Sequence, residues 1–276
     1  MLENFKIAGG HKNTVESAKN ILLEGGNAFD AAIAGVFSSM SCEYLYTGAA
    51  SGGAMLVKKN GFHPEIIDFF VETPSIDQSN VGDFKAIYAD FGDTKQEFNI
   101  GAGSVGIPGT IPGLIQIHKD YGSLPFSILV EQAIDLAKKG SFISKNQEYL
   151  SAVLSPIISS SRALESLFSK DGSLLKEGGL FVNADFASFL DQFLYEDPSL
   201  FYKHEVCPLF YQSFKNGGII ELKDLQEYSP IKRSPLELKY CGHDIFMNPL
   251  PSTGGMLISA GLEHLNKLDS TSRQDI

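Results

Sequence analysis

The chain has 276 residues, a hydrophobic fraction of 43% and a formal net charge of −11 at pH 7. This length fits one large domain or two small ones, and we expect residues 1–276 to form a single domain. The acidic balance argues against nucleic acid and against an anionic membrane as partners, because both select basic surfaces.

Two helices are predicted near the N-terminus. Asn13 and Glu16 form a capping-box pattern at the start of the first helix, and the glycine pair at 25–26 ends it. Asn27 is expected to cap the second helix, with Asp30 in its first turn. The second helix is rich in alanine and therefore thin, which favours close packing against a sheet.

A hairpin is predicted next. Residues 55–59 and 65–70 are rich in apolar and β-branched side chains, and an Asn-Gly turn at 60–61 separates them. The polar stretch that follows, from Pro74 to about residue 98, indicates an exposed loop or lid.

The segment from Gly106 to Leu114 reads GIPGTIPGL and contains two Pro-Gly pairs four residues apart. Proline fixes φ and removes a donor, whereas glycine permits positive φ, so the segment fits neither a regular helix nor a ladder strand. It predicts a main chain that closely approaches another part of the molecule. A helix is expected to follow, from Leu114 to Tyr121, ended by Gly122.

Residues from about 126 to 216 have a mostly helical pattern. Breaks in this helical region are expected at Gly140, Gly172 and Pro198.

The C-terminal part predicts a second hairpin and a last helix. Strands at 236–240 and 243–247 are expected to pair across Cys241-Gly242. A tight loop at 249–255 then leads to a helix at about 256–268, capped by the hydroxyl of Ser252 or Thr253. Strands flanked by helices and hairpins together indicate a layered α+β fold.

Cysteine usage and hydropathy bear on location and cofactors. Cys42, Cys207 and Cys241 are far apart and without C-x-x-C spacing, so we expect buried free thiols in a reducing compartment. No signal peptide is visible and no apolar run reaches about 18 residues, which favours a cytoplasmic location. The histidines lack metal-ligand spacing, so no metal and no cofactor are expected.

Six or more sequence blocks resemble those of γ-glutamyltranspeptidases, in the same order, over roughly residues 10–265. The block from Gly106 to Leu114, for example, is similar to GVPGTVAGL of that family. The resemblance covers only the N-terminal, large-subunit half of the family. The blocks are Glu24–Ala32, Ser51–Val57, Gly106–Leu114, Tyr121–Pro125 with Ala133–Ala137 and Gly140, Phe201-Tyr202, Gly217–Leu225 with Tyr228, and Pro249–Gly255.

This resemblance implies a fold and a reaction. The fold would be part of the four-layer αββα sandwich of N-terminal-nucleophile hydrolases, with a largely helical middle region and a second chain that completes it. In that family a precursor cuts itself before a threonine, which then serves as nucleophile and base and forms an acyl-enzyme with an amide substrate.

The catalytic residues of that reaction are not expected in this chain. None of the threonines of this chain lies in a segment that matches the family's TTHxSV. We therefore expect the nucleophilic threonine on a small subunit from the same precursor, and a small-molecule amide as substrate. The alternative is a truncated, non-catalytic relative that serves as a scaffold or binding module.

Phe70 bears on the substrate. The family's DFRE block holds a substrate carboxylate through its arginine, and the matching residues here run Asp68-Phe69-Phe70. A guanidinium suits a planar carboxylate, whereas an aromatic ring favours an apolar or amide-bearing group, as in cephalosporin-type side chains. Glu72 is the nearest charged residue and could meet a substrate amine. Alternatively, Phe70 is a core residue and Glu72 a solvated one.

Two glycine-containing turns complete the predicted substrate site. Ser51 and Gly52, and likewise Gly103 and Ser104, bring backbone amides into tight turns that could line the pocket and donate to an oxyanion. The alternative is that these glycines only allow close strand packing. In the family the oxyanion glycines belong to the small subunit.

Overall fold

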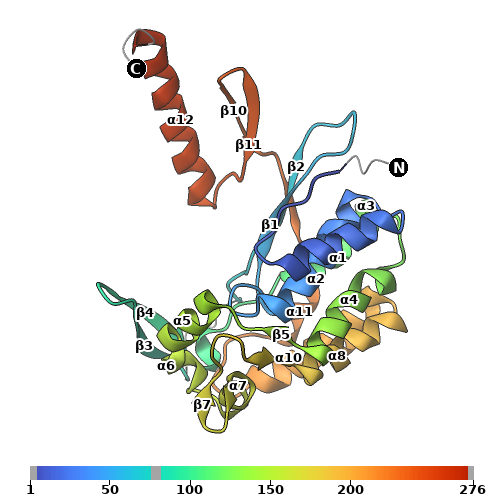
Figure 1. The fold of residues 1–276 in the computed structure, drawn as a ribbon, viewed down its shortest axis with the longest axis vertical. Helices are drawn as coiled ribbons and strands as arrows, with labels where there is room; N and C mark the ends of the chain where they lie inside the picture. The colour runs from blue at the N-terminus through green and yellow to red at the C-terminus, as the bar shows by residue number, and fades with distance from the viewer. Residues whose placement is uncertain (1–4, 76–81, 273–276) are drawn as a thin grey trace.

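The computed structural model describes residues 5–75 and 82–272, which form a mixed α+β fold (Figure 1). The helices are α1 (Lys12–Leu23), α2 (Ala28–Cys42), α3 (Thr110–Tyr121), α4 (Phe126–Lys139), α5 (Lys145–Val153), α6 (Ser155–Ile158), α7 (Arg162–Phe168), α8 (Ala184–Asp191), α9 (Pro198–Phe201), α10 (Cys207–Phe214), α11 (Leu222–Glu227) and α12 (Thr253–Ser272). Two short 3-10 helices are η2 (Ala102–Ser104) and η3 (Gln192–Leu194), and a π-helix is η4 (Tyr202–Val206).

The strands form one three-stranded sheet and four antiparallel pairs. The strands are β1 (Gly53–Val57), β2 (Glu65–Phe69), β3 (Lys85–Asp90), β4 (Lys95–Ile100), β5 (Ser141–Phe142), β6 (Ser169–Lys170), β7 (Ser173–Leu174), β8 (Leu180–Phe181), β9 (Ile231–Arg233), β10 (Leu236–Tyr240) and β11 (His243–Met247). The sheet has the order β1-β2-β9, and the pairs are β3-β4, β10-β11, β5-β8 and β6-β7.

The two N-terminal helices are present, but only the second has the predicted cap. Nδ1 of His11 accepts from the backbone N of Asn13 at 3.1 Å, so His11 is the cap of α1 and the prediction for Asn13 was wrong. Asn27 is the cap of α2 as predicted. Its Oδ1 accepts from Phe29 N at 2.8 Å and Asp30 N at 3.0 Å, and the Asp30 carboxylate accepts in turn from Asn27 N.

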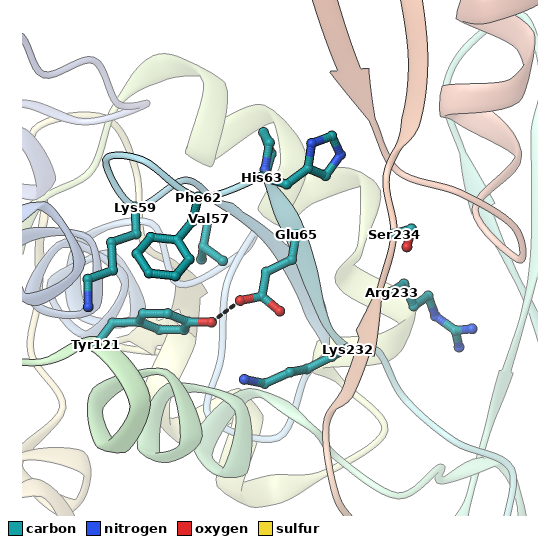
Figure 2. Close-up of a pocket in the computed structure, with 10 residues that line it drawn as sticks. Val57, Lys59, Phe62, His63, Glu65, Tyr121, Lys232, Arg233 and Ser234 are labelled. Atoms are coloured by element: carbon teal, nitrogen blue, oxygen red, sulfur yellow. Dashed lines mark hydrogen bonds between the residues drawn. The ribbon is translucent and has the colours of Figure 1, made fainter.

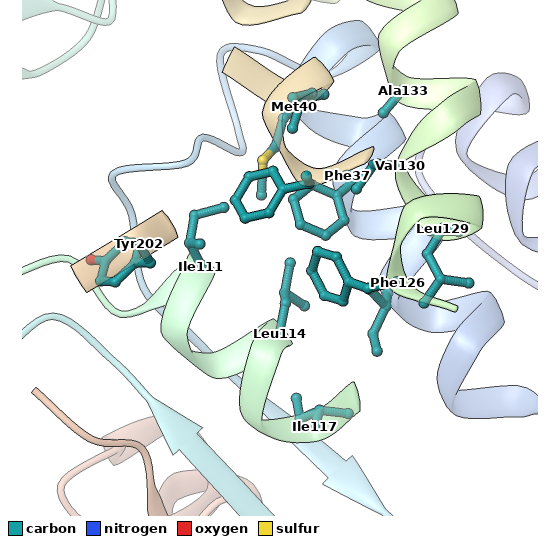
Figure 3. Packing of buried hydrophobic residues seen from close by; sticks show 14 of the residues in the cluster. Phe37, Met40, Ile111, Leu114, Ile117, Phe126, Leu129, Val130, Ala133 and Tyr202 are labelled. Carbon is teal, nitrogen blue, oxygen red and sulfur yellow. The ribbon is translucent and has the colours of Figure 1, made fainter. Parts of the chain in front are cut away.

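The thin helix α2 packs against helices rather than against the predicted sheet. Oγ of Ser17 on α1 donates to the carbonyl of Ala34 at 3.3 Å, and Ser38 Oγ donates to Ser17 Oγ at 2.8 Å. On its other side α2 meets α3 and α4 in the main core, where Phe37 stacks edge-on against Phe126 (Figure 3). Small residues therefore serve here to bring two helices close together.

The double Pro-Gly segment approaches β2 closely, as predicted. A Cβ at Gly109 would lie 2.1 Å from the carbonyl oxygen of Phe69, and one at Gly113 would lie 2.3 Å from the Cγ of the same residue. The helix was predicted to start too late, because α3 begins at Thr110 and includes the second Pro-Gly pair. Proline is tolerated there, since the first turn has no intrahelical partners for its N–H groups.

Both predicted hairpins are confirmed, and two others, β3-β4 and the short β6-β7, were missed. β1 pairs with β2, but residues 58–64 connect them instead of the predicted two-residue turn. β10 pairs with β11 across residues 241 and 242 as predicted. The predicted loop or lid at 74–98 is wrong for residues 85–98, since β3 and β4 pair there; residues 76–81 lie outside the described part of the chain.

The middle region is mostly helical, with short strand pairs between the helices. Gly140 and Gly172 adopt positive φ of 84° and 75° and interrupt the helical pattern, as predicted. The break expected at Pro198 is present at residues 195–197, and Pro198 itself occupies the first turn of α9.

The C-terminal hairpin and α12 extend together from the helical body (Figure 1). α12 begins at Thr253, earlier than predicted, so Gly254 and Gly255 lie inside the helix. Cys42 and Cys207 are buried, but Cys241 is exposed at the hairpin turn, which corrects the expectation of three buried thiols. Within the described residues, no helix is both long and apolar enough to cross a membrane.

Candidate functional site

One face of the three-stranded sheet forms the wall of a pocket of about 500 Å³. Side chains alternate along a strand, so Ile66, Asp68 and the following Phe70 share this face. The register places Arg233 of β9 opposite Ile66, and therefore on the same face. The opposite wall is the turn that leads into α12. The pocket is lined by Gly53, Ala54, Ile66, Asp68, Phe70, Arg233, Asn248, Pro249, Pro251, Ser252, Thr253 and Gly254.

An ion pair lies in this pocket. Nε of Arg233 donates to Oδ2 of Asp68 at 2.7 Å, and the two side chains are 29% and 15% exposed. The other carboxylate oxygen of Asp68 accepts from the backbone N of Phe70 at 3.0 Å. Both oxygens of Asp68 are thus engaged, and the pair fixes the strand end next to Phe70.

Phe70 has a fixed backbone and an exposed ring. Its carbonyl accepts from the Tyr228 hydroxyl at 2.8 Å, and Gly52 lies so close that a Cβ there would be 2.5 Å from Val71 N. Phe70 is nevertheless 65% exposed, so it does not belong to the core formed by this chain. An exposed ring held by a rigid backbone is suited to ligand contact.

Tyr228 contributes to the site and was not predicted as one of its residues. Burial, and after it the carboxylates of Glu72 and Asp68, raise the pKa of Tyr228 well above its ordinary value. Its hydroxyl therefore stays protonated and remains a donor to Phe70.

Ser51 and Gly52 directly precede Gly53 and Ala54 of β1, which line this pocket. The carbonyl of Ser51 accepts from the backbone N of Gly109 and of Thr110, both at 2.9 Å. The Ser51 hydroxyl donates to the carbonyl of Gly48 at 2.6 Å and lies 2.9 Å from the Thr110 hydroxyl. These bonds tie the glycine-rich turn to the start of α3.

The other predicted residues lie elsewhere. Glu72 forms a two-way backbone bridge with Ile107, and its side chain is exposed. Gly103 N donates to the carbonyl of Asp83 at 2.8 Å, and Ser104 N donates to that of Gly101 at 3.1 Å. The amides of Gly103 and Ser104 therefore already have backbone acceptors, Asp83 before β3 and Gly101 after β4. The structure gathers Ser51, Gly52 and Phe70, but not Gly103 and Ser104.

Arg233 is, after Tyr228, a second site residue that sequence reasoning missed. It lies 165 positions after Asp68, and only the pairing of β2 with β9 brings the two together. The available signal was composition, because the chain has few arginines and this one ends a short alternating segment.

A second pocket, of about 550 Å³, lies beside β9, and Arg233 belongs to its lining too (Figure 2). The Tyr121 hydroxyl donates there to Glu65, and Lys232 forms an ion pair with Asp120 at 2.9 Å. Figure 2 shows that Lys232 and Arg233 leave the strand in opposite directions. Across residues 5–75 and 82–272, no group of three or more His, Cys, Asp or Glu side chains is placed to hold a metal ion.

Comparison with known proteins places this chain in a family. The family model described as Gamma-glutamyltranspeptidase matches residues 14–275. The Glutathione hydrolase proenzyme of Escherichia coli is 30% identical over 273 residues, which cover 95% of this chain and 45% of that protein. The Acylase ACY 1 proenzyme of a Pseudomonas species is 27% identical over 95% of this chain and 48% of its own length. The chain thus spans about half the length of these curated relatives.

A solved structure agrees with this placement. The gamma-glutamyltranspeptidase of Pseudomonas nitroreducens, solved in complex with L-DON, superposes with a TM-score of 0.80 at 26% identity. The match covers 99% of this chain and 80% of that chain.

Proposed function

The chain belongs to the gamma-glutamyltranspeptidase family, and from this premise we propose that it is the large-subunit half of an amidohydrolase or acyltransferase. The enzyme would cleave γ-glutamyl or related amide bonds of small molecules. In this proposal the chain shapes the substrate pocket, and the nucleophile is contributed by a small subunit from the same precursor.

The reaction would proceed through an acyl-enzyme. The N-terminal threonine of the small subunit attacks the amide carbonyl, the amine leaves, and water or an acceptor amine releases the acyl group. The residues of this chain bind and orient the substrate. Phe70 contacts it, while Asp68 and Tyr228 hold the backbone of Phe70 in place.

The observation that carries the proposal is the pocket between β2 and the start of α12. Its volume of about 500 Å³ lies in the range of small-molecule sites. Two of the sequence blocks that resemble the family, Ser51–Val57 and Pro249–Gly255, contribute to its walls. Family membership and pocket geometry therefore both support a substrate-binding role for this chain.

A second chain is also supported by the exposed apolar surface of α12. Met256, Leu257 and Ile258 are 43%, 68% and 55% exposed, and Leu265 is 47% exposed. A monomeric protein rarely leaves a contiguous apolar surface uncovered. We propose that the small subunit packs here and completes the four-layer αββα sandwich.

Phe70 favours a second candidate within the same reaction class. Because its exposed ring lines the pocket, an acylase acting on apolar side-chain amides is the runner-up, and the acylase proenzyme from Pseudomonas is a relative of comparable identity. A non-catalytic scaffold or binding module is the third candidate, and it predicts no amidase activity in the test below.

The test is intact-mass analysis and N-terminal sequencing of every chain that co-purifies with this one from its native source. A second chain that starts with threonine, together with amide hydrolysis lost on Thr→Ala at that residue, is the expected result. A lone species of about 30 kDa without amidase activity would overturn the enzyme proposal and favour the binding module. Turnover of apolar acyl amides but not of γ-glutamyl amides would select the acylase.

A further inference from the structure

Arg233 lines this pocket, and its guanidinium has donors left for another group. Of the described residues, only Asp68 accepts a hydrogen bond from this guanidinium, and it does so through Nε. A guanidinium carries five N–H donors, so the two terminal nitrogens keep donors for another group. These two nitrogens form the edge that binds a carboxylate with two parallel bonds.

The lining of this pocket holds one positive and one negative side chain, Arg233 and Asp68, and further donors from the start of α12. Asp68 is the only other charged residue that lines this pocket, and both of its oxygens already accept hydrogen bonds. The opposite wall is the start of the 20-residue helix α12, with Ser252, Thr253 and Gly254 in the lining. The unpaired N–H groups and the dipole of a helix N-terminus also favour negative charge.

An apolar part of a ligand would contact a different residue of the pocket, Phe70. The ring of Phe70 lines the same pocket and is 65% exposed. Phe70 and Arg233 share one face of the sheet, with Asp68 bonded to both of them. A ligand that spans them would set a planar anion against the arginine and a carbon chain or ring against the phenylalanine.

We propose that Arg233 is a specificity-determining residue that binds a carboxylate of the substrate, in the pocket where Phe70 offers only an aromatic ring. The inference deepens the proposed function and rests on it for the amide nature of the substrate. It narrows the substrate class to amides that carry a free carboxylate, and it disfavours purely apolar acyl amides.

The test compares two probes that differ only in this carboxylate. They are γ-glutamyl anilide and its analogue with a carboxamide in place of the α-carboxylate. Calorimetry on the chain, with any chain that co-purifies, measures both dissociation constants. We expect the acid to bind at least about tenfold more tightly, since hydrogen bonds to charged groups reach that size.

Two substitutions on β9 distinguish carboxylate binding by Arg233 from a general effect of positive charge on the binding preference. Arg233→Gln is expected to abolish the preference for the acid. Lys232→Gln removes the same charge one residue away, on the face that pairs with Asp120, and is expected to leave the preference intact. If Arg233→Gln fails to fold, Arg233→Lys decides, because lysine can still pair with Asp68 but lacks the planar fork and should lower the preference several-fold.

The outcomes for the two proposals are distinct. No preference in the wild type, or an unchanged preference in the Arg233 variants, overturns the role of Arg233 whether or not the protein hydrolyses the anilide. A preference that depends on Arg233 without any turnover supports the binding role and counts against the proposed enzyme.

Discussion

The carboxylate of Asp30 joins the first turn of α2 to Ser123 in the connection between α3 and α4. Asp30 is fully buried, and its oxygens accept from the backbone N of Asn27 at 2.9 Å and of Ser123 at 3.0 Å. The Ser123 hydroxyl donates to the same group at 2.5 Å. One side chain thus serves as part of a helix cap and as a link between two regions of the core.

Asp30→Ala is expected to lower the free energy of unfolding by about 3 kcal/mol, because it removes a cap bond and leaves buried N–H groups unsatisfied. Urea unfolding followed by circular dichroism measures the change. Asp93→Ala, at an exposed position between β3 and β4, is the control and should have little effect. An equal loss in both variants would contradict the linking role of Asp30.

Gly113→Ala and Gly261→Ala should change stability in opposite directions. A Cβ at Gly113 would lie 2.3 Å from the buried ring of Phe69, so overpacking should cost about 1–3 kcal/mol. A Cβ at Gly261, in α12, would meet nothing within 4 Å, and alanine should stabilise that helix by about 1 kcal/mol. Thermal unfolding of both variants checks the signs; a stabilised Gly113→Ala would mean that α3 moves freely away from β2.

Tyr44→Phe should keep or raise stability and change its pH dependence. The Tyr44 ring stacks on Phe181 with ring centroids 3.7 Å apart, but its buried hydroxyl has no hydrogen-bond partner in the described part of the chain. Removing an unsatisfied hydroxyl at constant shape is neutral or stabilising, by about 1 kcal/mol at most.

The pH effect of Tyr44 has a definite sign. Burial raises the pKa of Tyr44 to about 12, so above about pH 10 the unfolded chain releases this proton more readily than the folded one. Stability is unaffected by this group below pH 10 and falls between about pH 10 and 12 in the wild type. Tyr44→Phe should lessen that fall, whereas Tyr195→Phe, at a residue 83% exposed, should not; chemical unfolding at pH 8, 10 and 11 distinguishes them.

Cys241 should be the one thiol among the three that reacts readily with iodoacetamide in the folded protein. It is exposed, whereas burial raises the pKa of Cys42 and raises that of Cys207 to about 11. Thiolate is the reactive form, so both buried groups should react slowly. Intact mass at pH 8 should show a single adduct that Cys241→Ser abolishes; two or more adducts before unfolding would show that the core opens.

The sequence predicted those features that neighbouring residues decide. Asn27 and Asp30 stand three positions apart and form a capping box, and the β10-β11 hairpin has its turn between two alternating segments. The Pro-Gly pairs also carried enough local information to predict a close approach, although not its partner Phe69. The ordered sequence blocks were sufficient to identify the family, which the family model confirms.

Pairing between distant segments was beyond sequence reasoning. Arg233 reaches Asp68 only because β9 adds to β2, and no local pattern encodes that choice of neighbour. The same holds for Tyr228, whose hydroxyl crosses 158 positions to the carbonyl of Phe70. The β3-β4 hairpin was missed because its strands are mostly polar and exposed, so they lack the apolar alternation by which strands are recognised.

The shortness of β9 makes the pocket sensitive to register. Since Lys232 and Arg233 are adjacent and point to opposite faces of the sheet, a slip of one residue against β2 would exchange them. The guanidinium would then face Tyr121 and Glu65, and an ammonium would take its place beside Phe70. A single-residue deletion between α11 and β9 could therefore change ligand selectivity while every side chain near Phe70 on β2 stays the same.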